Sequence, residues 1–278
     1  MQDCLIDALL DTLKLLPYLF VTFLLLEFIE HKINSKKLLS RGQKVGPLVG
    51  GLLGALPQCG FSAMAANLFT GRVITIGTVV AVFLSTSDEM LPIMLGEQVD
   101  FGTILKIIGI KVLIGVTVGF ICDLVFCKFF KKSKDHEISH LCKEEHCHCE
   151  EHGVVVSSLI HTLKTGAFLL AANILIGLII YWIGEENLAN FLLGSKPLSY
   201  LLASLVGLIP NCAGSIIITE LYLAGLISLG SMMAGLLTGC GLGLLLLFKN
   251  HKNWRENITI LAIIYIVGVV AGLIIDLF

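Results

Sequence analysis

The chain contains the same pattern twice, and this internal repeat constrains its fold more than any other feature. Residues 48–125 align with residues 201–278 without a gap, at an offset of 153 residues. Polar, glycine and aspartate positions recur at matched places, as in Pro57-Gln58-Cys59 with Pro210-Asn211-Cys212, Gly77 with Gly230, and Asp123 with Asp276. A repeat of this length predicts two structurally equivalent halves, an architecture common among transporters.

Composition places these halves in a membrane. Hydrophobic residues make up 56% of the 278 residues, and charged residues make up 14%. Apolar runs at 13–28, 104–126, 165–183 and 258–278 approach the roughly 20 residues that a membrane-spanning helix needs. We therefore expect an all-α integral membrane protein in contact with the lipid bilayer. The net charge of −2 gives no indication of nucleic-acid binding.

Loop charges predict that the two halves enter the membrane in opposite directions. Loop 31–44 carries five lysines or arginines, whereas its counterpart 184–196 carries two glutamates and one lysine. Loop 96–102 is acidic, and its counterpart 249–256 is basic. Since basic loops stay on the cytoplasmic side, both pairs change sides between the halves. We expect inverted-topology repeats in a bacterial inner membrane, with the lysine-rich central linker in the cytosol.

Three regions follow from this topology: a first transmembrane repeat at 1–127, a cytosolic linker at 128–154, and a second, inverted repeat at 155–278. Each repeat should hold three full spans and one pair of half-helices, giving about ten helical elements. The pieces 46–56 and 61–70 are too short to span at about 1.5 Å per residue, so they predict a re-entrant hairpin. Short tilted spans are the alternative to hairpins.

The breaks at membrane depth are where chemistry is expected, because irregular backbone survives there only inside protein or beside a polar cavity. Half-helix ends carry partial charges that attract ions. The predicted substrate-binding residues are Gln58, Cys59 and Ser62 at the first hairpin tip, Asn211, Cys212 and Ser215 at the second, Ser87, Asp88, Glu89 and Cys240 at two further breaks, and Glu220. Small residues packing the hairpins together, or carboxylates at outer helix ends, would explain the same patterns without a site.

Other ionisable residues lie within or near the predicted spans. Lys111 could pair with Asp88 or Glu89, or it could extend its ammonium group to the membrane surface. Asp123 and Asp276, which align in the repeat, are expected to cap helix ends.

The linker is rich in soft metal ligands. Its imidazoles and thiols suit zinc, copper and similar ions, and its spacing matches no fixed zinc site. We expect a flexible metal-collecting segment; a merely polar linker is the alternative. The candidate ligands are His140, Cys142, His146, Cys147, His148, Cys149 and His152.

The paired motifs resemble those of the ten-transmembrane heavy-metal exporter family, whose members are often labelled manganese transporters or arsenic efflux proteins. The resemblance rests on residues 54–62, 85–89 and 210–215 and on the histidine- and cysteine-rich middle. It implies export of a heavy metal or metalloid, such as a manganese-like cation or arsenite.

These observations predict a secondary transporter and not an enzyme. The sequence has no Walker A motif, so proton coupling is expected in place of ATP hydrolysis. No cofactor is expected apart from the transported ion and zinc or another soft metal on the linker. A channel or a permease for a small anion or organic arsenical is the alternative. The sequence leaves a homo-oligomer open.

Overall fold

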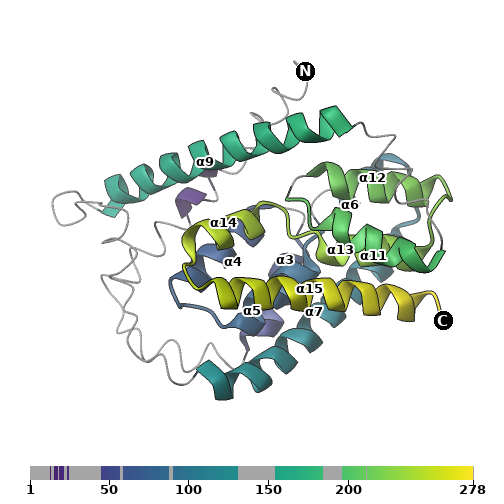
Figure 1. Ribbon diagram of the computed structural model, residues 1–278, viewed down its shortest axis with the longest axis horizontal. Coiled ribbons are helices and arrows are strands. Elements are labelled where there is room, and N and C mark those ends of the chain that lie inside the picture. The colour runs from purple at the N-terminus through teal and green to yellow at the C-terminus, as the bar shows by residue number, and fades with distance from the viewer. Residues whose placement is uncertain are drawn as a thin grey trace.

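The computed structural model describes residues 45–56, 59–87, 90–130, 154–183, 196–210 and 212–277, with a few positions between 13 and 24. Over these residues the chain forms helices and turns without a strand, which confirms the predicted all-α fold (Figure 1). The first half contributes α3 (Gly46–Gly54), α4 (Cys59–Thr70), α5 (Ile76–Ser85), α6 (Met90–Gly96) and α7 (Phe101–Phe130). The second half contributes α9 (Val154–Ile183), α11 (Lys196–Gly207), α12 (Cys212–Leu223), α13 (Leu229–Thr238), α14 (Leu242–Asn250) and α15 (Trp254–Ile275).

Local sequence signals explain where several of these helices begin and end. Thr75 precedes α5 and Ser228 precedes α13, and each side-chain oxygen accepts a hydrogen bond at 3.2 Å from the amide three residues later. This is the usual stabilisation of a helix start by a hydroxyl side chain. The turns after α4 and α12 each contain a residue with positive φ, Arg72 at 56° and Gly225 at 71°, and these two positions align in the repeat.

Helices α3 and α4 form a re-entrant hairpin. A Cβ atom added at Gly46 would meet Thr78, and one added at Gly54 would meet Ser85, so α3 runs parallel to α5. Because α3 ends at the depth of Ser85 and α5 begins at Ile76, α4 has to bring the chain back to the side from which α3 entered. The hairpin tip therefore lies level with the break between α5 and α6.

The second half repeats this arrangement. The Ser199 and Ser231 hydroxyls are 2.7 Å apart near the start of α11, and Thr238 Oγ1 donates to Ser204 O at 2.8 Å further along. Helix α11 thus runs parallel to α13, and α12 returns the chain toward Ser228. The sequence repeat has a structural counterpart, with each hairpin tip level with a break in the helix that follows.

The long helices α7 and α15 pack antiparallel to α5 and α13 through pairs of glycines. A Cβ atom added at Gly77 would lie 2.1 Å from Gly119 O, and one added at Gly230 would lie 2.2 Å from Gly272 O. Contacts this short are incompatible with any side chain. These glycines let the helix backbones approach closely, as small residues do in membrane helix packing.

The two aligned aspartates hold the starts of the broken helices. Asp123 Oδ1 accepts a hydrogen bond from Gly77 N at 2.9 Å, and Asp276 Oδ1 accepts one from Gly230 N at 2.7 Å. Each carboxylate therefore satisfies a first-turn amide that has no partner within its own helix. This confirms the prediction that Asp123 and Asp276 cap helix ends.

The second helix of each hairpin packs against the other half of the chain. Helix α4 packs on α14, and α12 packs on α6. Asn250 Nδ2 donates to Asn67 Oδ1 at 2.9 Å, which places the end of α4 beside the end of α14. The start of α5 consequently lies on the face of the molecule where α14 ends. In Figure 1, α7 ends at the lower left and α15 ends at the right, so these mates run in opposite directions.

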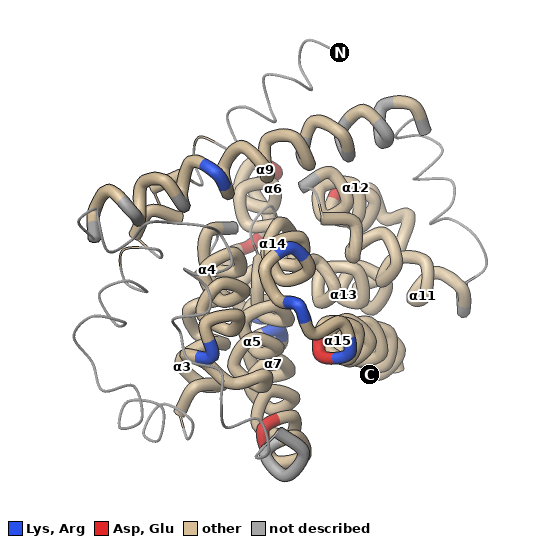
Figure 2. Tube along the Cα trace, turned by 60° about the vertical axis from the view of Figure 1, so that its left-hand side comes forward, with Lys and Arg blue, Asp and Glu red and all other residues tan. Residues whose placement is uncertain are grey.

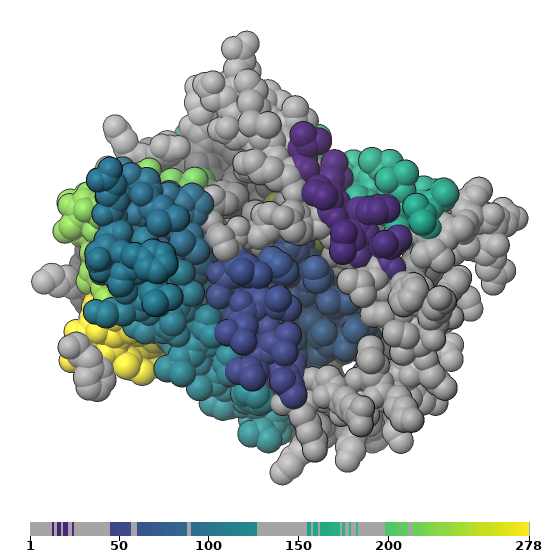
Figure 3. Space-filling model, turned by 180° about the vertical axis from the view of Figure 1, so that it is seen from behind, coloured from purple at the N-terminus to yellow at the C-terminus, as the bar shows by residue number. Residues whose placement is uncertain are grey.

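The helices have the length and composition of membrane spans. Within the described residues, Ile76–Gly96, Phe101–Phe126, Leu229–Asn250 and Trp254–Ile275 are long and apolar enough to cross a bilayer. Charged residues are sparse along the described helices and gather near the turn between α14 and α15 (Figure 2). Figure 3 shows α3 and α7 on the surface of the opposite face, where both helices expose large apolar side chains. Such an apolar surface suits contact with lipid.

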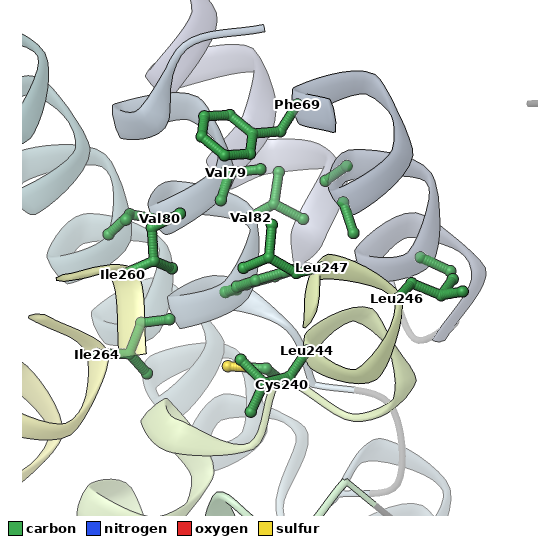
Figure 4. Close-up of a cluster of buried hydrophobic side chains, with 14 of the residues drawn as sticks. Phe69, Val79, Val80, Val82, Cys240, Leu244, Leu246, Leu247, Ile260 and Ile264 are labelled. Atoms are coloured by element: carbon green, nitrogen blue, oxygen red, sulfur yellow. The ribbon is translucent and has the colours of Figure 1, made fainter. Parts of the chain in front are cut away.

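Apolar packing fills the interior where the two halves meet. Val80 and Phe83 of α5 belong to the same buried cluster as Leu247 of α14 and Ile264 of α15. Figure 4 shows this cluster, with Cys240 beside Leu244 and Ile264. The core thus fixes each broken helix against elements of the other half.

Candidate functional site

The break between α5 and α6 is a buried run of hydroxyl residues. The side chains of Ser85, Thr86 and Ser87 are all buried. Ser85 Oγ donates to Ala81 O at 2.7 Å, and Thr86 Oγ1 donates to Val82 O at 2.8 Å. These hydroxyls turn back onto the carbonyls of α5. The chain therefore leaves the helix in the middle of a candidate span while the hydroxyls add second hydrogen bonds to carbonyls near its end.

The break between α13 and α14 aligns with the first and uses other residues for the same purpose. Thr238 Oγ1 donates to Gly235 O at 2.9 Å, and Cys240 Sγ donates to Thr238 O at 3.2 Å. Gly241 has a φ of 53°, which glycine adopts at little cost and which redirects the chain into α14. Cys240 is buried with 1% of its surface exposed.

Lys111 of α7 joins the two breaks. Its side chain is fully buried, at 0% exposure, and its Nζ donates to Thr86 O and to Leu236 O, the latter at 3.0 Å. One acceptor belongs to the first half and the other to the second, so both breaks lie at the same depth. This burial excludes the alternative in which the ammonium group reaches the membrane surface.

Each hairpin places a serine beside the second break or beside the helix that follows it. A Cβ atom added at Gly243, in the first turn of α14, would lie 2.7 Å from Ser62 C and O. A Cβ atom added at Gly239, in the second break, would lie 3.2 Å from Ser215 Oγ. Ser62 is fully buried and Ser215 is partly buried. The start of α4 therefore contacts α14, and the start of α12 contacts the α13–α14 break.

The remaining predicted site residues fall into two groups. Glu220 lies at an exposed position near the end of α12. The other group lies outside the described residues, or has side chains that are outside them: Gln58, Cys59, Asp88, Glu89, Asn211 and Cys212 at the tips and first break, and the linker positions His140, Cys142, His146, Cys147, His148, Cys149 and His152. These assignments remain predictions.

Sequence reasoning missed a second polar cluster at the junction of the halves. Arg72 donates from Nη1 and Nη2 to both oxygens of Glu256, at 2.8 and 3.1 Å. Glu256 is 3% exposed and also lies 2.9 Å from Nε2 of His251, a ring that packs on Phe69 at 5.0 Å. One signal in the sequence could have drawn attention to Arg72. It aligns with Gly225 in the repeat, and both positions have a positive φ, which favours glycine over arginine.

The chemical character of the centre follows from its backbone. The C-terminal ends of α5 and α13 point carbonyl oxygens and the negative ends of their helix dipoles at the junction. Such ends bind cations in membrane transporters with broken helices. Here the carbonyls of Thr86 and Leu236 accept hydrogen bonds from Lys111 Nζ.

Repeated hairpins, apolar helices of spanning length and breaks at a common depth are the features of a multi-pass membrane protein. The chain belongs to the family described as "Putative, 10TM heavy-metal exporter", whose family model matches residues 1–183 and 155–278. This membership confirms the family resemblance seen in the sequence. No match was found among curated proteins or among solved structures.

Proposed function

We propose that this protein is a secondary transporter that exports a heavy-metal or metalloid ion across the bacterial inner membrane. The observation that carries the proposal is the junction at which Lys111 binds Thr86 O of one half and Leu236 O of the other. A buried polar junction between two structurally equivalent halves is where transporters of this architecture hold their cargo. The family description supports the export of heavy metals. We infer a transporter and not an enzyme.

We infer further that the halves are inserted in opposite directions. The Arg72–Glu256 ion pair brings the turn after α4 together with the start of α15. Loop charge assigns residues 249–256 to the cytoplasmic side, and a hairpin that enters from the basic loop 31–44 returns to that side at Arg72, so the contact agrees with the inverted topology. In such a protein, alternating access moves one half against the other around a fixed site. The central linker would then lie in the cytosol.

The proposed cargo site comprises the hairpin tips and the two breaks. Gln58, Ser62, Asn211 and Ser215 would supply oxygen ligands, and Cys59, Cys212 and Cys240 would supply sulfur. Ser87, Asp88 and Glu89 would bind the cation or carry protons, and Glu220 would serve the same path. A soft ion or arsenite would depend on the thiols, whereas a hard ion such as Mn²⁺ would depend on the carboxylates and amides.

One observation favours a second candidate, a permease for a small anion or a neutral metalloid. The fixed positive charge of Lys111 lies at the junction, with its ammonium group fully buried. A positive centre attracts anions and repels cations unless carboxylates offset it. Asp88 and Glu89 would provide that offset in an exporter of cations. The two candidates therefore differ in whether these carboxylates are required.

Flux into proteoliposomes tests both candidates directly. Mn²⁺, Zn²⁺ and arsenite would be offered in parallel, with and without an imposed pH gradient. We expect flux of at least one of them, driven by the gradient, and its loss in Asp88→Asn or Cys59→Ser. Cys122→Ala is the matched control, because Cys122 is buried in the apolar core of α7. Wild-type levels of flux in both site variants would remove the site assignment, and absence of flux for all three ions would remove the proposed export.

A further inference from the structure

The Lys111 side chain ends between backbone carbonyl oxygens, a kind of ligand that metal and alkali cations also bind. Its ammonium group has no access to solvent, yet it meets backbone carbonyls from two different helices. Burying an ammonium ion is costly unless hydrogen bonds and opposite charge compensate for its lost hydration. The site must therefore be complementary to a cation.

The helix breaks create this complementarity. In a continuing helix the Cys240 amide would donate to Leu236 O; here it donates to Thr238 O at 2.8 Å, and Leu236 O accepts from Lys111 instead. Thr86 is the residue that follows the last turn of α5, so its carbonyl also points out of the helix. Each helix end carries about half a negative charge, so both ends favour an ammonium group between them.

The repeat shows that this cation is supplied by one half alone. Lys111 aligns with Ile264 of α15, which is fully buried in the apolar cluster of Figure 4. The second half therefore offers no equivalent charge from α15 at this position. A single ammonium group serves both breaks, and it has to cross from α7 of the first half to α13 of the second.

We propose that this junction, formed by Thr86 O, Leu236 O and the helix ends that carry them, is a cation-binding site whose resident cation is the Lys111 ammonium group. Lys111 is then a specificity-determining residue. It keeps free monovalent cations off these carbonyls and leaves the cargo to the side chains of the tips and breaks. Removing it should create a site for a small free cation such as Na⁺ or methylammonium.

The experiment compares Lys111→Ala with Lys111→Met in purified protein and in proteoliposomes. Alanine leaves space for an added cation, whereas methionine fills the space without charge. We expect both variants to lower the melting temperature by roughly 3–8 °C. Sodium or methylammonium chloride should restore much of this loss in Lys111→Ala and none in Lys111→Met, with choline chloride as the bulky control salt.

The flux measurement rests on the proposed function, and the melting measurement does not. We expect Lys111→Ala to lose about ten-fold or more of the export rate and to regain part of it with methylammonium. If wild-type protein moves none of the ions tested, the proposed export fails while the melting data still decide the role of Lys111.

Two results would overturn the inference. One is a Lys111→Met variant as stable as the wild type, because apolar packing would then suffice at the junction. The other is a folded Lys111→Ala variant whose melting temperature ignores sodium and methylammonium. Should Lys111→Ala fail to fold, Lys111→Met decides alone: it must melt below the wild type in every salt.

Discussion

Arg72 and Glu256 form a two-pronged ion pair between the two halves of the chain, across a sequence separation of 184 residues. Arg72 makes this contact from a left-handed backbone conformation, with φ of 56°, at a position where the second half has Gly225. A residue other than glycine pays about 1 kcal/mol or more for that conformation. The pair, together with the packing of the Arg72 guanidinium over Phe69 at 5.7 Å, offsets this cost.

Replacing Arg72 should therefore give different results with different residues. Arg72→Gln keeps the strained backbone and loses the ion pair, so we expect it to lower the free energy of unfolding by roughly 1–3 kcal/mol. Arg72→Gly loses the pair but relieves the strain and should cost about 1 kcal/mol less. Denaturant unfolding in detergent measures both. Arg255→Gln is the control, since Arg255 is exposed in the same region; equal losses for Gln and Gly would contradict the role given to the backbone strain.

The two capping aspartates should contribute different amounts to the free energy of unfolding although they occupy aligned positions. Asp123 is half-buried and accepts hydrogen bonds from Gly77 N and, at 2.8 Å, from Thr75 Oγ1, whereas Asp276 is exposed. We expect Asp123→Ala to lower the free energy of unfolding by roughly 1–2 kcal/mol and Asp276→Ala by less, because water can replace the lost acceptor. Thermal unfolding would compare them with Glu97→Ala, an exposed control. A larger loss in Asp276→Ala would show that burial does not set the strength of the cap.

The sequence was sufficient to predict the hairpins and the capping aspartates, because each rests on a local rule. Half-helices too short to span, a proline at each tip and an aspartate repeated at one register all follow from the printed sequence. The helix bounds agree to within a few residues: the piece predicted at 46–56 is α3 at Gly46–Gly54. Each of these patterns occurs in both halves, so the internal repeat supports each prediction twice.

The contacts that join the halves could not be predicted, because they depend on packing between distant segments. The sequence suggested Asp88 or Glu89 as a partner of Lys111, and both lie outside the described residues; the two acceptors seen are the backbone carbonyls of Thr86 and Leu236. The residue types at 86 and 236 do not indicate that these carbonyls can accept a hydrogen bond from a side chain. They can do so because the helices break there. The Arg72–Glu256 pair could not be predicted for the same reason, although the aligned repeat does show an arginine at 72 where the second half has Gly225.

The histidine- and cysteine-rich linker is expected to bind metal independently of transport. Replacing the cysteines and histidines of residues 140–152 by serine and alanine should abolish zinc binding at micromolar concentrations, because imidazole and thiolate are its preferred ligands. Flux in proteoliposomes should stay within about two-fold of the wild type, a difference of roughly 0.4 kcal/mol in the barrier. Equilibrium dialysis and flux assays measure the two quantities separately. A parallel loss of both would mean that the linker delivers the cargo.

The glycine contacts between α5 and α7 give the sharpest test of the helix packing. A methyl group at Gly77 would lie 2.1 Å from Gly119 O, so Gly77→Ala must push the two helices apart. We expect it to lower the free energy of unfolding by roughly 2–4 kcal/mol. The aligned Gly230→Ala, with 2.2 Å to Gly272 O, should behave alike.

Gly109→Ala is the matched control for these two variants, since a Cβ atom at Gly109 on α7 meets nothing within 4 Å. Its helix should gain up to about 1 kcal/mol from the better helix propensity of alanine. Unfolding of all three variants in one detergent compares them directly. If Gly77→Ala were as stable as Gly109→Ala, the close approach of α5 and α7 would be wrong. The depth assigned to the α5–α6 break, which depends on that packing, would then have to be revised as well.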